Sequence, residues 1–113
     1  SAFINQDGNI DKEKLLKILK IYETSIQAYI DEVVNKEYPN SSDTELIRSR
    51  SQVLLSNVKL IDKSVLDSFE KIKENKKEIY VKLIDNEYRN YFPGLEPSLL
   101  NEIHKKVDIS IKD

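Results

Sequence analysis

Apolar side chains recur at helical spacing along most of the chain. Near the start, the steps between them alternate between four and three residues, through Leu15, Leu19, Tyr22, Ile26, Tyr29 and Val33. Because an α-helix has about 3.6 residues per turn, these side chains share one face. Asp11 is placed to cap the first turn, and Pro39 disfavours helical backbone at Tyr38. The pattern predicts a first helix over about 11–37.

A second amphipathic stretch follows a short loop at residues 39–41. Ser42 and Glu45 have the spacing of a capping box at a helix start. The apolar seam behind them runs through Ile47, Leu54, Val58, Ile61, Val65 and Ile72. Beyond Ile72 the seam is lost, and the next apolar stripe starts out of phase by about 100° around a helix axis. We therefore predict a helix over 42–73 and a turn or kink at 73–77.

Two shorter helices complete the prediction. Tyr80, Ile84, Tyr88 and Tyr91 mark a helix over 77–92, which Pro93 and Gly94 end. Pro97 suits the first position of a last helix, over 96–110. Residues 107–111 also alternate strictly between apolar and polar, so a short terminal strand is an alternative, although we favour the helix.

Short connections between amphipathic segments are typical of antiparallel bundles. The fold class predicted is all-α, a small antiparallel bundle of three to four helices. The 113 residues have the size of one domain. We assign residues 1–113 to a single helical-bundle domain, with residues 1–10 as an extended N-terminal segment.

The composition argues against several classes of function. The 18 basic and 20 acidic residues give a net charge of -2, which lacks the basic excess of a nucleic-acid binder. With no Cys and one His, we expect no metal site and no cofactor. No apolar run approaches the ~18 residues of a transmembrane segment.

Catalytic machinery has no local support in the sequence. The two glycines lie far apart, which excludes a phosphate-binding loop, and no serine lies in a nucleophile motif. His104 falls one residue beyond the apolar face of the last helix, as a boundary residue does. A catalytic role would need a carboxylate from another helix, so we expect no enzyme.

The second predicted helix carries another apolar stripe, at a spacing of seven residues. Leu46, Val53 and Leu60 lie more than about 100° from the main seam of this helix. Two apolar faces need two partners. Either this helix is central and other helices cover both faces, or the stripe docks a helix of another protein or of a second copy.

The turn after the third predicted helix gathers aromatic side chains and an arginine. Arg89, Tyr91 and Phe92 are residue types that often anchor interfaces. We predict that they either close the end of the bundle or form part of an interaction surface.

Two tyrosines of the first predicted helix suggest a different function. Tyr22 and Tyr29 lie on the apolar seam, and a buried phenol needs a hydrogen-bond partner. Candidate partners on the second helix are Ser51, Asn57 and Ser64. The two phenols either belong to the core or line a polar pocket for a small ligand.

The function predicted is therefore a non-enzymatic protein–protein interaction or self-association module, whose partner is another protein or a second copy in a homodimer. The alternative is a helical bundle that senses a small ligand, as an extracytoplasmic sensor or effector-binding domain does. The abundance of Ile, Lys and Asn favours a bacterial source. The compartment stays open, either cytoplasmic or extracytoplasmic after cleavage of a leader.

Overall fold

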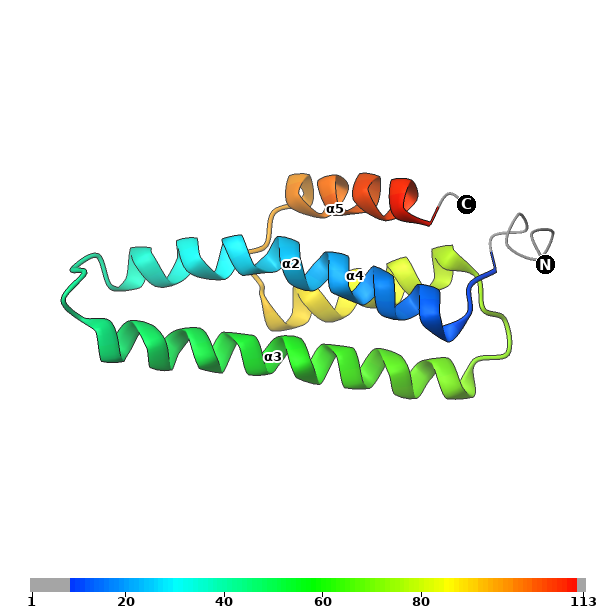
Figure 1. The fold of residues 1–113 in the computed structure, drawn as a ribbon, viewed down its shortest axis with the longest axis horizontal. Coiled ribbons are helices and arrows are strands. Elements are labelled where there is room, and N and C mark those ends of the chain that lie inside the picture. The colour runs from blue at the N-terminus through cyan, green and yellow to red at the C-terminus, as the bar shows by residue number, and fades with distance from the viewer. Residues whose placement is uncertain (1–8, 112–113) are drawn as a thin grey trace.

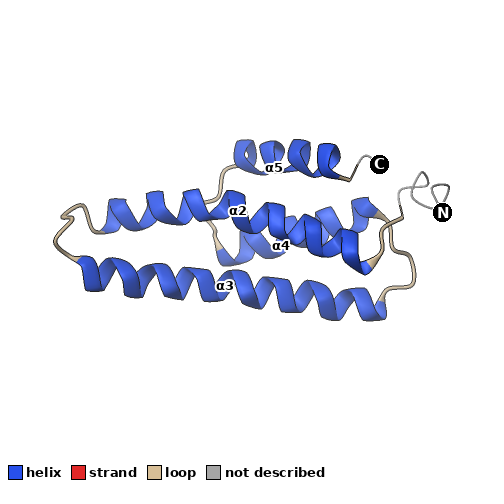
Figure 2. Ribbon diagram, in the orientation of Figure 1, coloured by secondary structure: helices blue, strands red, loops and turns tan. Residues whose placement is uncertain are grey.

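The computed structural model describes residues 9–111, which form four α-helices (Figures 1 and 2). These are α2 (Lys12–Glu37), α3 (Thr44–Lys71), α4 (Lys77–Tyr91) and α5 (Pro97–Ser110). Successive helices run in opposite directions, which confirms the predicted all-α antiparallel bundle. Most of the predicted extended segment 1–10 lies outside the described residues.

The start of the described chain is tied to the turn between α3 and α4. Asn9 forms an isolated antiparallel bridge with Lys76. The amide of Ile10 donates to the carbonyl of Asn75 at 2.7 Å. This contact fixes the entry to α2 beside the end of α3.

The predicted cap of α2 is confirmed, and the predicted capping box of α3 is wrong. Asp11 Oδ1 accepts a hydrogen bond from the Lys14 amide at 2.8 Å. At α3, in contrast, the amide and hydroxyl of Ser42 both donate to Asn40 Oδ1. Because the Asn40 side chain holds Ser42 in the loop, the helix begins two residues later, at Thr44.

The other predicted boundaries agree with the structure to within two residues. The break predicted at 73–77 lies between the end of α3 at Lys71 and the start of α4 at Lys77. Pro97 occupies the first turn of α5. This helix continues to Ser110, so the alternative of a terminal strand is wrong.

The core lies along the seams that the sequence predicts, except that it is displaced near the end of α2 and that Tyr91 of the predicted α4 stripe is exposed. Leu15, Leu19, Tyr22 and Ile26 of α2 are buried as expected. Further along α2, Tyr29 and Val33 are only partly buried, and Ile30 and Val34 are buried in their place. The burial therefore follows steps of four residues toward the C-terminal end of α2.

The four helices differ in length, which leaves part of α3 uncovered. α2 and α3 have 26 and 28 residues, whereas α4 and α5 have 15 and 14. α4 packs against α3, and α5 packs against α2. Figure 1 shows that α4 covers only the C-terminal part of α3, so the N-terminal half of α3 has only α2 beside it.

None of the helices within residues 9–111 combines the length and the apolar character needed to cross a membrane.

Candidate functional site

The predicted apolar stripe of α3 is accessible to solvent. Leu46 is 52% exposed, and Val53 and Leu60 are each 50% exposed. The four core residues of the same helix, in contrast, are no more than 7% exposed: Leu54, Val58, Ile61 and Val65. The bundle therefore does not cover the second apolar face of α3.

Tyr91 is brought next to this stripe by the end of α4. Its side chain is exposed and lines a shallow groove of about 330 Å³ together with Leu60. Ser64 and Asp67 of α3 line the same groove. Two sets of candidate residues that are separate in the sequence thus form one surface, which we call the α3 face: Leu46, Val53, Leu60 and Tyr91.

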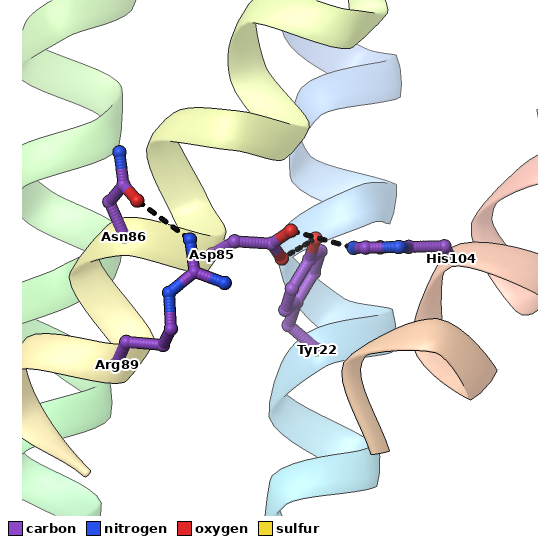
Figure 3. A network of polar contacts seen from close by, with 5 residues as sticks. All are labelled: Tyr22, Asp85, Asn86, Arg89 and His104. Carbon is purple, nitrogen blue, oxygen red and sulfur yellow. Dashed lines mark hydrogen bonds and ion pairs between the residues drawn. The ribbon is translucent and has the colours of Figure 1, made fainter. Parts of the chain in front are cut away.

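Arg89 and Phe92 do not belong to the α3 face. Phe92 is buried, stacks on Tyr88 with ring centroids 6.0 Å apart and meets the edge of Tyr29. This burial agrees with the alternative in which Phe92 closes the end of the bundle. Arg89 lies two positions before Tyr91, which is about 200° away around α4. It donates instead to Asn86 Oδ1 of the same helix at 2.8 Å (Figure 3).

Tyr22 lies in a hydrogen-bond network that connects three helices. Its hydroxyl donates to Asp85 Oδ1 of α4 at 2.7 Å. His104 Nε2 of α5 lies 2.7 Å from Asp85 Oδ2 (Figure 3). The expected partners of Tyr22 on α3 are therefore wrong, and the carboxylate that His104 would need comes from α4.

Burial determines the protonation of Tyr22. It raises the pKa of this phenol far above its ordinary value, and the hydrogen bond to Asp85 raises the pKa further. The phenol is therefore a neutral hydrogen-bond donor. The Tyr22 ring also stacks on Tyr88, with centroids 5.4 Å apart. The Tyr22 side chain is fully buried in this packing.

Among residues 9–111, the carboxylate that contacts His104 is that of Asp85, and this contact orients the imidazole. A carboxylate that fixes one imidazole nitrogen leaves the other free for proton transfer or ligand binding. No group of three or more His, Cys, Asp or Glu residues suited to a metal occurs within the described part of the chain. The arrangement supports a structural link between α2, α4 and α5.

Tyr29 does line a groove. It opens between α2 and the segment that enters α5, with a volume of about 430 Å³. Glu32, Glu102 and Leu99 are also in its lining. A Cβ atom on Gly94 would come within 3.0 Å of the Tyr29 hydroxyl oxygen. Of the two tyrosines predicted to form a pocket, only Tyr29 borders open space.

Two buried polar atoms, one on α3 and one on α4, lack hydrogen-bond partners among the described residues. Asp62 Oδ1 and the Tyr88 hydroxyl are inaccessible to solvent, and neither has a hydrogen-bond partner among the described residues. Burial, and then the nearby Glu23, raise the pKa of Asp62 to about 6. Sequence reasoning missed this pair of acidic residues on α2 and α3.

The sequence does hold one signal for the buried polar residues. Asp85 directly follows the core residue Ile84, and His104 directly follows the core residue Ile103. A polar side chain at the edge of an apolar seam lies where two helices meet.

Comparison with family models, curated proteins and solved structures yields no match to this chain.

Proposed function

We propose that this chain is a non-enzymatic protein–protein interaction module of a bacterial protein, and that it binds through the α3 face. The observation that carries the proposal is the row of half-exposed Leu46, Val53 and Leu60 on a helix whose other face is fully packed. A spacing of seven residues returns to nearly the same side of a helix after two turns. Such a row suits the apolar face of another helix.

The apolar surface that the row leaves in water supports the same proposal. Burying an apolar side chain stabilises a protein by about 25 cal/mol per Å² of apolar surface removed from water. Three half-exposed aliphatic side chains in one row leave that stabilisation unused in the isolated chain. Tyr91 extends the row at the end of α4, and tyrosine is frequent among residues that dominate binding energy.

Photo-crosslinking in cells that produce the protein tests this proposal. A photoreactive amino acid at position 53 should give a discrete covalent adduct with a protein. The matched control is position 16, because Leu16 of α2 is also apolar and 47% exposed. We expect no discrete adduct there. The adduct at position 53 should disappear when Leu46 and Leu60 are changed to Asp.

Fold integrity is checked in parallel. Val53→Asp should leave the helical circular dichroism intact, because the side chain is half in solvent. If Val53→Asp and Leu60→Asp unfold the chain, or if position 53 reacts no more than position 16, the α3 face is not a docking surface.

Sensing of a small ligand is a second candidate function, favoured by the groove at Tyr29. Glu96 and Glu102 in its lining suit a small cationic ligand, which would compete with Lys36 for Glu32, 3.3 Å from the Lys36 ammonium group. In a thermal-shift screen of small amines, at least one should raise the Tm of the wild type and fail to do so for Glu32→Gln with Glu102→Gln. Equal shifts in both proteins would argue against this function.

A further inference from the structure

We infer that the occupant of the α3 face is a second copy of this chain, and that the two α3 helices pair antiparallel about a two-fold axis at Val53. This inference rests on the proposed function and names its partner. A pairing about a two-fold axis uses the same surface of both copies, so that surface must be complementary to itself. The residues of the α3 face satisfy this condition in apolar contact, charge and space.

The apolar residues are symmetric about Val53. Leu46 and Leu60 lie seven residues before and after it, which is about 10 Å in each direction at 1.5 Å per residue. In an antiparallel pairing, Leu46 meets the partner's Leu60, and Val53 meets the partner's Val53. Every exposed aliphatic residue of the row is then covered by another.

Charge favours one of the two possible directions of the partner helix. Glu45 and Lys59 are exposed and lie beside the row, one near each end. Within the chain, Glu45 also pairs with Arg48 at 2.8 Å, on the solvent-exposed surface of the helix. An antiparallel pairing places Glu45 near the partner's Lys59, and the two-fold axis repeats this contact. A parallel pairing about a two-fold axis puts the two Glu45 side chains, and the two Lys59 side chains, on opposite edges of the contact, so the attraction between Glu45 and Lys59 is lost. Glu45 then faces the partner's Arg50, which is already paired with Glu37 at 3.2 Å. The charges therefore favour the antiparallel arrangement.

The side chains between the apolar row and the two charged residues are small, which permits the two α3 helices to approach closely. Ser49 and Ser56 are exposed and follow Leu46 and Val53 by three residues. On a helix, positions three apart are neighbours, so the serines lie alongside the apolar row. Their small side chains leave the aliphatic groups of both copies free to meet.

The unequal helix lengths provide the space. α4 ends at Tyr91, and Tyr91 shares a groove with Leu60, so α4 lies beside α3 only from about Leu60 onward. In an antiparallel pair, the partner's α4 therefore lies beyond Leu46, past the start of this copy's α3. In a parallel pair, both α4 helices would lie at the same level.

Single-cysteine variants of the whole chain test the geometry, since the sequence has no Cys. A disulfide requires Cα atoms less than about 7 Å apart. In an antiparallel pair, a cysteine can therefore form a disulfide with the same position of the second copy only close to the two-fold axis. Under mild oxidation, Val53→Cys should form a covalent dimer, and the control Leu16→Cys should not. Leu46→Cys and Leu60→Cys should each stay monomeric alone and crosslink when mixed.

Charge reversal tests the direction of pairing by a second measurement. In sedimentation velocity at high protein concentration, Glu45→Lys and Lys59→Glu should each weaken dimer formation several-fold. The double variant should restore it, because each pair again has opposite charges. Circular dichroism verifies that all three variants are folded.

The outcomes separate this inference from the proposed function. A photo-adduct at position 53 with a different protein, together with no Val53→Cys dimer, overturns the second-copy inference and leaves the α3 face as a docking surface. No adduct and no dimer overturn both. Self-crosslinking of Leu46→Cys as readily as Val53→Cys indicates a parallel pair and also overturns the inference.

Discussion

Replacing Asp62 with Asn should stabilise the protein at neutral pH. Asp62 Oδ1 is buried without a hydrogen-bond partner among the described residues, and Glu23 lies near it. Burial and Glu23 raise the pKa of Asp62 from 3.8 to about 6, although Lys59 and Lys20 lower it in part. The ionised carboxylate is therefore less favourable in the folded chain than in the unfolded chain. Asn removes the charge and keeps the shape of the side chain.

The magnitude follows from the pKa values of the two states. An acid whose folded pKa is raised stabilises the fold fully below its unfolded pKa, and this contribution is lost as the pH rises through the folded pKa. One pKa unit corresponds to about 1.4 kcal/mol, so the rise corresponds to at most about 3 kcal/mol. Because Asp62 is partly accessible to solvent, we expect Asp62→Asn to gain about 1–2 kcal/mol at pH 7.5.

Urea unfolding followed by circular dichroism, repeated from pH 4 to pH 8, measures this effect. The free energy of unfolding should be nearly equal in the two proteins at pH 4, where Asp62 is protonated. The difference should grow up to about pH 6 and then stay constant. Asp67→Asn is the control, because Asp67 is an exposed carboxylate on the same helix. A difference between Asp62→Asn and wild type that does not change with pH, or a loss of stability at pH 7.5, would refute the reasoning.

Three further predictions concern the core. Tyr22→Phe should cost about 1.5–3 kcal/mol in urea unfolding, because the buried Asp85 loses a hydrogen-bond donor; an unchanged stability would contradict the network. Tyr88→Phe, the matched change in the ring stacked on Tyr22, should not destabilise the chain and should gain up to about 1–3 kcal/mol, because its buried hydroxyl has no partner among residues 9–111. Ile61→Ala should cost about 2–5 kcal/mol and Val53→Ala much less, since Ile61 is fully buried and Val53 is half exposed; equal costs would place Val53 in the core.

The fold follows from the sequence because its signals are local. A helix depends on residues three and four apart, and proline and glycine mark its ends, so the bounds of the four helices agree with the prediction to within two residues. The capping box at Ser42 is wrong because Asn40, outside the motif, accepts from both the amide and the hydroxyl of Ser42 and holds it in the loop, and Asp43 takes the N-cap position. Local competition of this kind is not visible in a motif taken alone.

The displacement of the core in α2 has a different cause. Tyr29 and Val33 continue the seam of Leu15 and Tyr22, yet Ile30 and Val34 are the buried residues. Toward its end α2 has α3 as its main neighbour, so the side turned to α3 is buried there. The sequence shows which side of a helix is apolar, but the arrangement of its neighbours decides how much of that side is covered.

The candidate site depended on long-range contacts, which the sequence predicted only in part. The exposed row on α3 could be found, because its spacing of seven sets it apart from the seam. The meeting of Leu60 with Tyr91 could not, nor could the contact of Tyr22 with Asp85, 63 residues away. These contacts depend on which helices are neighbours and on where α4 ends.

The unequal helix lengths also divide the molecule into regions of different rigidity. In the region where all four helices lie side by side, the α2 amides near Leu19 and Tyr22 have α3, α4 and α5 packed around them. The α2 amides near the loop at 38–43 rest mainly on one neighbour, α3. Amide hydrogen exchange should therefore be slowest in the first half of α2 and rise toward Glu37, as that end opens without unfolding of the rest. The part of the α2–α3 hairpin that α4 and α5 leave uncovered, which carries Val53, is thus the more flexible end of the protein. Its two helices can shift relative to each other when this end contacts another surface.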